Sequence, residues 1–411
     1  AVGGPDWYTV GSTAVSEQGG WSSSLQVEGG IPYVAYTDLA HGKRLTVRTF
    51  DRGDWKDVGS PGFSAGEAGD VSMKSDGGTL YAAYQDGGNG NRASVMKYDG
   101  TAWEYVGAPG FSAGNAQQLS LYIDNGTLYV AYQDGAAGAK ATVMRFDGTA
   151  WISVGNPGFT PRSAYNLSLA VDNGQPYLAF QDYDQSLKAS VMTFDGSDWV
   201  YVGGAGLSGG KVGDISFLFY KGAPHIAYMD SSAGLNWKAT VMAFDGTSWA
   251  PVGSPGFSAG GAQYIKLAVS NGELYAGYQD DDGSDLRATV MKYDGAGWTN
   301  VGRSKFTAGD TFFNSLYADD GTLFMAYMDK DNEFKVTVMY YGMNELPEAN
   351  SVAVGGVARV GQTLTGSYVY SDAEYDREGA SAYRWYAADD ASGTGKTAIA
   401  GATGRTLTLT A

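Results

Sequence analysis

The stretch Lys140–Gly155, KATVMRFDGTAWISVG, decides the fold of this chain. It has the pattern of a strand, a tight Asp147-Gly148 turn whose glycine tolerates a positive φ, and a second strand that begins at Trp151. The same phrase recurs along most of the chain, and its tryptophan returns every 48–50 residues, at Trp7, Trp55, Trp103, Trp151, Trp199, Trp249 and Trp298. A constant period of this length indicates a repeat architecture.

Each period contains four strand-like runs separated by turn residues, as in Leu119–Ile123, Thr127–Gln133, Lys140–Phe146 and Trp151–Val154. Four strands per repeat are typical of a β-propeller. Seven first strands begin near Ser24, Ser72, Ser120, Ser168, Ser216, Lys266 and Ser315. A tryptophan strand, Asp6–Val10, precedes all of them, and the last period lacks one. We therefore predict an all-β, seven-bladed β-propeller over residues 1–343, in which the N-terminal strand closes the last blade.

The repeat stops after Tyr341, and we expect a linker over residues 344–350 and a separate β module over residues 351–411. The RWY strand at Arg384–Tyr386 and the closing GATGRTLTLT of this module resemble the immunoglobulin-like, β-sandwich spacers of bacterial cell-surface proteins. The whole chain thus resembles a bacterial secreted or cell-surface propeller with an Ig-like module at its C-terminus. This resemblance implies an extracellular or cell-surface location and a module that is cut short.

Composition excludes several classes of function. The formal net charge of −17 argues against nucleic acid as a partner and against anionic membranes. The chain has no cysteine, which excludes disulfides, thiol catalysis and Cys-ligated zinc. No apolar run is long enough for a membrane span, so no membrane insertion is expected.

The Asp-Gly-x-x-Trp turn, as in Asp99-Gly100 with Trp103, resembles the Asp box of sialidases and related propellers. It differs from that box because its Asp and Gly are adjacent. An Asp box stabilises a turn and does no chemistry, and the catalytic residues of sialidases cannot be assigned in this sequence. The resemblance therefore implies a fold and no activity.

Two other repeated features are interpreted as structural. An aspartate ends the second strand of every blade and is followed by a basic residue across the loop, which predicts a cross-strand ion pair such as Asp134 with Lys140. The alternative is a ring of carboxylates that binds metal. The Pro-Gly-Phe-Ser-Ala-Gly phrase, as in Pro109–Gly114, is expected to place its phenylalanine between neighbouring blades.

The repeats differ most at two positions that enter the first strand, on the face that surrounds the axial opening. The first position holds Trp21, Gly69, Gln117, Tyr165, Gly213, Gln263 and Phe312. The second holds Ser22, Asp70, Gln118, Asn166, Asp214, Tyr264 and Phe313. Trp237 adds an aromatic side chain in a lengthened loop between the second and third strands. We call this face of the propeller, around its axial opening, the mouth.

Aromatic rings stack on the apolar face of a sugar, and amides and carboxylates bind its hydroxyls. This mixture predicts a non-catalytic module that binds a polysaccharide or cell-surface glycan at the mouth. The alternative is that these residues bind nothing and differ between repeats only because exposed loop positions vary freely. The predicted ligand-binding residues are Trp21, Asp70, Gln118, Tyr165, Asn166, Asp214, Tyr264, Phe312, Phe313 and Trp237.

Two other functions stay open. A polysaccharide hydrolase or lyase would need two facing carboxylates, and Asp70 and Asp214 lie three blades apart around the ring. A protein-adhesion platform would bind a protein partner instead. No cofactor is expected, although the loop that contains Asp281, Asp282 and Asp285 has the oxygen ligands that Ca²⁺ prefers.

Overall fold

A computed structural model describes residues 4–11, 14–51, 53–343, 348–371, 378, 380–390 and 392–410. The chain divides into two compact units. The larger comprises Gly4–Asp51 and Trp55–Gly342, and the smaller is formed mainly by Met343–Ala411. Most of the predicted linker, residues 344–347, lies outside the described residues.

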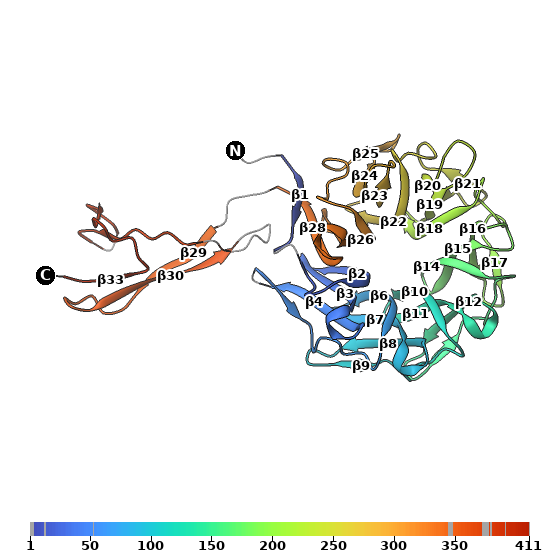
Figure 1. The fold of residues 1–411 in the computed structure, drawn as a ribbon, viewed down its shortest axis with the longest axis horizontal. Helices are drawn as coiled ribbons and strands as arrows, with labels where there is room; N and C mark the ends of the chain where they lie inside the picture. Colours follow the sequence, from blue (N-terminus) through green and yellow to red (C-terminus); the bar gives the residue numbers. More distant parts are fainter. Residues whose placement is uncertain are drawn as a thin grey trace. The chain divides into compact units, whose positions relative to one another are not determined.

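The larger unit is a seven-bladed β-propeller, in which seven four-stranded antiparallel sheets follow one another around a ring (Figure 1). The first strands pack beside each other at the centre of this ring. They are β2 (Gly20–Glu28), β6 (Ala68–Asp76), β10 (Ala116–Asp124), β14 (Ala164–Asp172), β18 (Val212–Tyr220), β22 (Gly261–Ser270) and β26 (Thr311–Asp319). The second strands are β3 (Ile31–Asp38), β7 (Thr79–Asp86), β11 (Thr127–Asp134), β15 (Gln175–Asp182), β19 (Ala223–Asp230), β23 (Glu273–Asp281) and β27 (Thr322–Asp329).

The outer half of each blade consists of the third strand, the Asp-Gly turn and the short tryptophan strand. The third strands are β4 (Arg44–Asp51), β8 (Arg92–Tyr98), β12 (Lys140–Phe146), β16 (Lys188–Phe194), β20 (Lys238–Phe244), β24 (Leu286–Tyr293) and β28 (Lys335–Gly342). The fourth strands are β1 (Asp6–Thr9), β5 (Asp54–Asp57), β9 (Trp103–Tyr105), β13 (Trp151–Ser153), β17 (Trp199–Tyr201), β21 (Trp249–Pro251) and β25 (Trp298–Asn300). Short 3₁₀ turns join second to third strands at η1 (Leu39–His41), η2 (Gly87–Asn89), η3 (Gly135–Ala137) and η4 (Lys330–Asn332).

The N-terminal strand closes the ring, as predicted. β1 pairs antiparallel with β28, with Trp7 opposite Tyr341, so the last sheet has the order β1-β28-β27-β26 (Figure 1). The blade numbering used below follows the chain: β2–β5 form blade 1, and β26–β28 with β1 form blade 7. Closure leaves no blade with an incomplete sheet.

The Trp-x-x-Val-Gly phrase connects neighbouring blades. The indole nitrogen of Trp103 donates to the carbonyl oxygen of Val58 in the preceding blade, at 2.7 Å. Gly59, next to that valine, has φ +78°, and a Cβ there would lie 3.0 Å from the Trp103 ring, so glycine is required. The same indole bond recurs at the other six tryptophans, Trp7, Trp55, Trp151, Trp199, Trp249 and Trp298.

The phenylalanine of the Pro-Gly-Phe phrase packs between blades, as predicted. Phe63 stacks on Trp103 of the next blade, with ring centroids 4.5 Å apart and an interplanar angle of 1°. Equivalent stacks join Phe111 to Trp151, Phe159 to Trp199, Phe257 to Trp298 and Phe306 to Trp7. The repeated aromatic residues are therefore committed to the interfaces between blades.

The repeated aspartate is structural, but the predicted ion pair is wrong. Asp134 lies opposite Lys140 in the strand register, yet its carboxylate accepts from the Ala136 amide at 2.9 Å and the Thr142 hydroxyl at 2.9 Å. In the described part of the chain, none of the seven aspartates forms an ion pair with its opposite basic residue. Six of the seven aspartates are buried and accept hydrogen bonds from backbone amides or hydroxyls, whereas the opposite basic residues are half-buried or exposed and extend toward solvent.

The smaller unit, described by itself, contains a three-stranded antiparallel sheet of β29 (Glu348–Gly355), β30 (Thr363–Ser371) and β33 (Thr406–Thr408). A two-stranded pair, β31 (Tyr386–Ala387) with β32 (Thr397–Ala398), accompanies it. The unit buries Trp385, whose indole nitrogen donates to the Gly404 carbonyl at 2.8 Å. The two motifs that carried the immunoglobulin-like resemblance therefore contact each other, and the assignment to that class stays a prediction.

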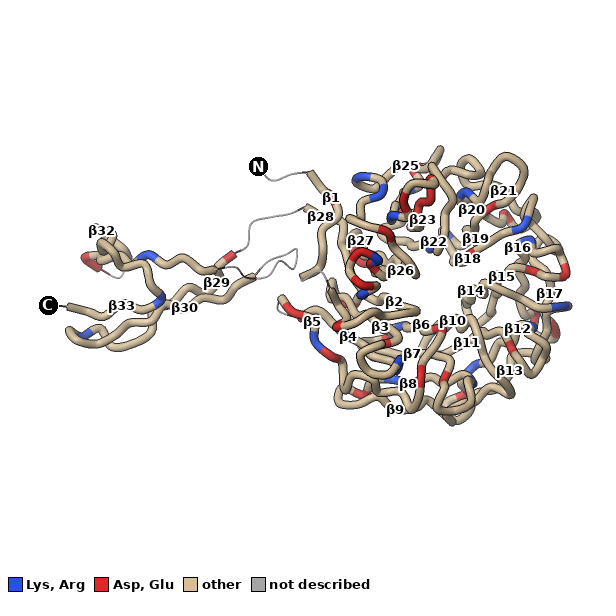
Figure 2. Tube along the Cα trace, viewed as in Figure 1, with Lys and Arg blue, Asp and Glu red and all other residues tan. Residues whose placement is uncertain are grey.

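Charged residues are spread over the loops and blade edges of the propeller, with acidic positions on every side of the ring (Figure 2). Among the described residues, no helix has the length and hydropathy that a membrane crossing requires.

Candidate functional site

A β-bulge interrupts every first strand at the mouth. The register between first and second strands shifts just after the first variable position, for example between Gln117 and Ser120. The second variable residue then has a left-handed backbone in all seven blades: Ser22, Asp70, Gln118, Asn166, Asp214, Tyr264 and Phe313, with φ of 34–53°. A bulge redirects a side chain away from the ladder, and a strained backbone of this kind marks positions worth attention.

Several of these bulge residues hold the neighbouring blade. Asp70 Oδ2 accepts from the backbone N–H of Gln118 at 2.8 Å, and Asp214 Oδ2 accepts from the backbone N–H of Tyr264 at 2.7 Å. The side-chain Oε1 of Gln118 likewise accepts from the backbone N–H of Asn166. The sequence predicts that these polar side chains bind a ligand, and the structure shows that they also form hydrogen bonds between adjacent blades.

Aromatic side chains gather where blades 6, 7 and 1 meet. Tyr264 and Phe313 have ring centroids 5.1 Å apart, and Phe312 and Phe334 have centroids 6.0 Å apart. Phe334 is joined to the strand of Trp21 because the Gly20 amide donates to the Phe334 carbonyl at 3.0 Å. Trp21, Phe313 and Phe334 expose 47%, 41% and 42% of their surface. We call Tyr264, Phe312, Phe313, Phe334 and Trp21 the aromatic crescent.

Sequence reasoning did not select Phe334, although a signal for it was present. Phe334 directly precedes the third strand of its blade, the position that Trp237 occupies in blade 5. Both residues have positive φ, 58° for Phe334 and 63° for Trp237. An aromatic residue in a left-handed turn is poorly accommodated, so a comparison of this loop position across the repeats would have found both.

Trp237 lines a groove between blades 5 and 6. The groove has a volume of about 610 Å³, and its lining includes Trp237, Gln263, Asp281 and Asp282. Trp237 is 40% exposed and is held by two backbone bonds, its amide to the Asp230 carbonyl at 2.8 Å and its carbonyl from the Ala262 amide at 2.9 Å. Gln263, which lines the groove, directly precedes Tyr264 of the aromatic crescent in β22.

Glycine forms the floor of this groove. A Cβ at Gly260 would lie 2.0 Å from the Asp281 carbonyl oxygen, so a side chain there would force β22 and β23 apart. Gly261, opposite Asp281 in the register, also lines the groove. Asn236 and Lys238 also line the groove, so its lining combines an indole with amides, carboxylates and an ammonium group.

The remaining predicted residues lie elsewhere on the ring. Tyr165 is in blade 4, where its ring contacts Tyr183 at 6.5 Å, and the Arg162 guanidinium lies 4.6 Å from the Tyr183 ring centroid. Asn166 is beside it on β14. The structure thus pairs the rings of Tyr264 and Phe313 and the rings of Phe312 and Phe334, and a backbone hydrogen bond joins the strand of Trp21 to Phe334. Tyr165 and Asn166 lie in another blade, away from these residues.

The acidic loop after β23 has an internal cation. The Lys305 ammonium lies 2.6 Å from Asp282 and 2.5 Å from Asp285, and together with Ser284 it holds the pKa of Asp282 well below its usual range. Asp281 accepts from the amide of Gly283 at 3.0 Å. Within the described residues, no three or more histidine, aspartate or glutamate side chains are arranged to hold a metal ion.

We expect Lys305→Met to create a Ca²⁺ response that the parent protein lacks. Removing the ammonium leaves Asp282 without a cation, and Asp285 keeps only the Arg287 guanidinium at 3.3 Å, so a divalent cation can neutralise the remaining charge. Thermal unfolding with CaCl₂ and with EDTA should give equal Tm values for the parent and a Ca²⁺-dependent rise for the variant. A rise in the parent that Asp282→Asn abolishes would instead make this loop a native Ca²⁺ site.

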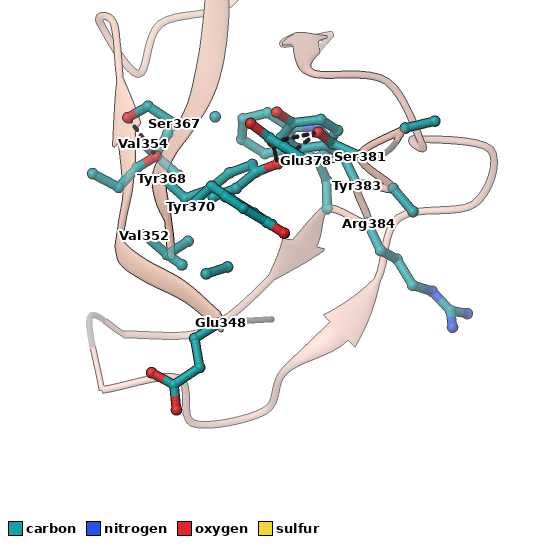
Figure 3. Close-up of a pocket in the computed structure, with 16 residues that line it drawn as sticks. Glu348, Val352, Val354, Ser367, Tyr368, Tyr370, Glu378, Ser381, Tyr383 and Arg384 are labelled. Atoms are coloured by element: carbon teal, nitrogen blue, oxygen red, sulfur yellow. Dashed lines mark hydrogen bonds between the residues drawn. The ribbon is translucent and has the colours of Figure 1, made fainter. Parts of the chain in front are cut away.

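A second hollow lies within the smaller unit and also has a volume of about 610 Å³. Figure 3 shows the side chains of Tyr368, Tyr383 and Glu378 gathered there, with the Tyr368 hydroxyl bonded to Glu378 and to Ser381, the latter at 2.6 Å. Three of its polar side chains, Tyr368, Glu378 and Ser381, are thus bonded to one another. None of the predicted site residues lines it, and the mouth of the propeller remains the candidate functional site.

No protein-family model matches this sequence, and no curated protein matches it. Several solved structures are similar in fold. They include a puromycin-hydrolysing peptidase of Mycobacterium tuberculosis (TM-score 0.54, 13% identity, 87% of this chain and 60% of that chain), an ulvan lyase of a polysaccharide lyase family (0.49, 14%, 79% and 94%) and a mutant of the lectin AAL of Aleuria aurantia bound to Fucα1-6GlcNAc (0.44, 14%, 70% and 97%). At these identities a likeness concerns the fold alone, and the fold of this chain is a seven-bladed β-propeller.

Proposed function

We propose that this protein is a non-catalytic recognition module that binds a polysaccharide or a cell-surface glycan at the mouth of its propeller. The observation that carries the proposal is a set of aromatic residues on successive blades, which we call the path: Trp237, which lines a groove with Gln263, and the residues of the aromatic crescent. Exposed rings offer stacking surfaces, and the amide and carboxylates beside them offer hydrogen bonds to hydroxyls. The path crosses blades 5, 6, 7 and 1, which suits an extended saccharide.

The proposal places the protein outside the cell or on its surface, where polymeric glycans are the available partners. The absence of cysteine makes the fold independent of redox conditions. The resemblance of the smaller unit to bacterial surface spacers supports the same location and a bacterial origin.

The test is a glycan array probed with the full chain and with variants of the path. We expect binding that Trp237→Ala and Trp21→Ala each weaken about tenfold or more, because truncating a central aromatic anchor costs on the order of 2 kcal/mol. Tyr386→Ala is the matched control, since Tyr386 is 43% exposed but belongs to the smaller unit. A blank array with a folded protein, or binding that the path variants leave unchanged, would contradict the proposal. Capture of a protein ligand that free sugars do not displace would support adhesion instead.

A polysaccharide-active enzyme is the second candidate, and one observation favours it. Burial raises the pKa of Asp70. A carboxyl group that acts as the general acid and protonates a glycosidic oxygen needs such a raised pKa. Asp70 and Asp214 would be the acid and its partner. If the protein is such an enzyme, the parent should cleave a polysaccharide that it binds, and Asp70→Asn should lose the cleavage but retain the binding. A polysaccharide that is bound by the parent and stays intact would exclude the enzyme.

A further inference from the structure

A hollow of about 590 Å³ lies between blades 4 and 5, on the face opposite the mouth. Its lining includes Gly222, from the turn between the first and second strands of blade 5, and Asp245, from the Asp-Gly turn of the same blade. Both turns connect the strand ends that are remote from the mouth. We call this cavity the Tyr177 hollow, after one of the blade 4 residues that line it.

Four aromatic residues line the Tyr177 hollow, and none of its described lining residues is basic. Tyr177 of β15 and Phe219 of β18 pack edge to face across the two blades, with ring centroids 5.0 Å apart and an interplanar angle of 77°. The other two are Tyr201, whose hydroxyl donates to Asp182 at 3.0 Å, and Phe244. Aromatic residues therefore line the hollow from both blades.

Two carboxylates, Asp172 and Asp245, also line the hollow. In blade 3 the counterpart of Asp172 is Asp124, which accepts from the Gly174 amide of the next blade at 2.8 Å. Within the described residues, Asp172 forms no such bond to blade 5 and accepts only from its neighbour, the Asn173 side chain, at 3.1 Å. Hydrogen bonds from two amides of its own turn lower the pKa of Asp245, so this carboxylate stays ionised at neutral pH. The hollow thus combines aromatic residues with negative charge.

The equivalent hollow between blades 1 and 2, of about 420 Å³, provides a comparison within the same chain. Lys97 lines that hollow, and its counterpart in the strand register of blade 5 is Ala243. The counterpart of Phe219 in blade 2 is Ser75. Relative to the hollow of blades 1 and 2, the Tyr177 hollow therefore gains an aromatic ring and lacks an ammonium group.

We propose that the Tyr177 hollow binds a quaternary ammonium group, the trimethylammonium end of a small ligand such as choline. Aromatic rings attract such a cation, and the carboxylates add Coulomb attraction. A quaternary ammonium has no N–H group and needs no hydrogen-bond acceptor, whereas a primary ammonium is strongly hydrated and would have to give up its water. The formal net charge of −17 also favours a cation. This site is separate from the mouth and goes beyond the glycan binding proposed above.

The test is calorimetric titration of the full chain with choline chloride at constant ionic strength. The neutral control is dimethylbutanol, in which a tert-butyl group replaces the trimethylammonium group. We expect choline to bind about tenfold or more tightly than this isostere, because only choline gains the cation–π and Coulomb attraction. Phosphocholine carries the same cation beside a phosphate that Asp172 and Asp245 repel, so it should bind more weakly than choline.

Two substitutions introduce residues that blade 2 already carries at the same positions, so both variants should fold. Ala243→Lys adds an ammonium group and should weaken choline binding about tenfold or more, by charge repulsion. Ala243→Gln is its matched control, because it adds bulk without charge and should retain most of the binding. Phe219→Ser removes one ring and should weaken choline binding as well.

Three results would overturn the proposal: no choline binding by the folded parent, equal binding of choline and its neutral isostere, or equal choline binding by the parent and Ala243→Lys. Phosphocholine that binds more tightly than choline would contradict the role of the carboxylates. NMR gives an independent readout, since choline must shift the ring signals of Tyr177 and Phe219, and unshifted signals would place the ligand elsewhere. Choline binding together with a blank glycan array would support this site and contradict only the proposal for the mouth.

Discussion

Trp7→Ala should destabilise the propeller by about 3–5 kcal/mol, the usual loss for removing a buried indole. Trp7 is 2% exposed, its indole nitrogen donates to the Val301 carbonyl at 2.9 Å, and its ring stacks on Phe306 at 4.1 Å. It is the main side-chain anchor of β1, a strand of only four residues. Its loss should detach β1 and leave the outer edge of β28 unpaired, which favours association between molecules.

Urea denaturation measures the loss in stability, and limited proteolysis near residue 10 together with light scattering reports the opening of the ring. Trp298→Ala is the matched control, because Trp298 donates to Val252 at 2.8 Å and stacks on Phe257 at 4.5 Å. Its strand lies within the continuous chain and cannot leave the ring. Equal proteolysis and association of the two variants would show that Trp7 is no more important for closure than any other repeated tryptophan.

Asp86→Ala should cost about 3 kcal/mol or more, because it removes a fully buried carboxylate that accepts several hydrogen bonds, one of them from the buried Ser94 hydroxyl. Asp86 is fully buried, and it accepts from the Gly88 amide at 3.0 Å, the Ser94 hydroxyl at 2.7 Å and the Asn89 amide at 2.8 Å. These bonds shape the turn η2 and fix the start of the third strand. Asp86→Asn should also be destabilising, since an amide cannot accept as many of these bonds as a carboxylate does.

Asp99→Ala in the same blade provides the control. Asp99 accepts from the amides of Thr101 and Ala102 at 2.7 Å, but its turn is exposed, so water can replace the lost acceptor. Urea denaturation should show a clearly smaller loss for Asp99→Ala than for Asp86→Ala. Equal losses of stability in the two variants would show that burial does not make the hydrogen bonds of the second-strand aspartate more important than those of an exposed turn.

Much of the propeller could be predicted from the sequence, because its information is local and repeated. The period of the tryptophans gave the blades, the Asp-Gly turns gave the hairpins, and the position of Asp6–Val10 gave the closure. The phenylalanine of the Pro-Gly-Phe phrase was also assigned correctly. Each of these features follows from the alternation and turn chemistry of a short segment, and seven copies make each one visible.

The partners of polar side chains could not be predicted in the same way. The paired positions of Asp134 and Lys140 followed from the register, but the register does not say that the carboxylate is enclosed and bonded to Thr142 instead. Asp70 and Asp214 bond to amides of the next blade, contacts between residues about 50 positions apart in the chain. Such contacts depend on the spacing of blades, which no single segment determines.

The sequence by itself determined the class of fold, the number of blades and the places where the mouth departs from symmetry. Only the tertiary structure decided which of those places belong together: the ring pairs Tyr264–Phe313 and Phe312–Phe334, and the groove that Trp237 lines with Gln263. The physical reason is that a repeat fixes each strand through local hydrogen bonds, whereas a site arises where side chains from several blades converge. Curvature and closure of the ring bring them together, and these are properties of the packed blades as a whole.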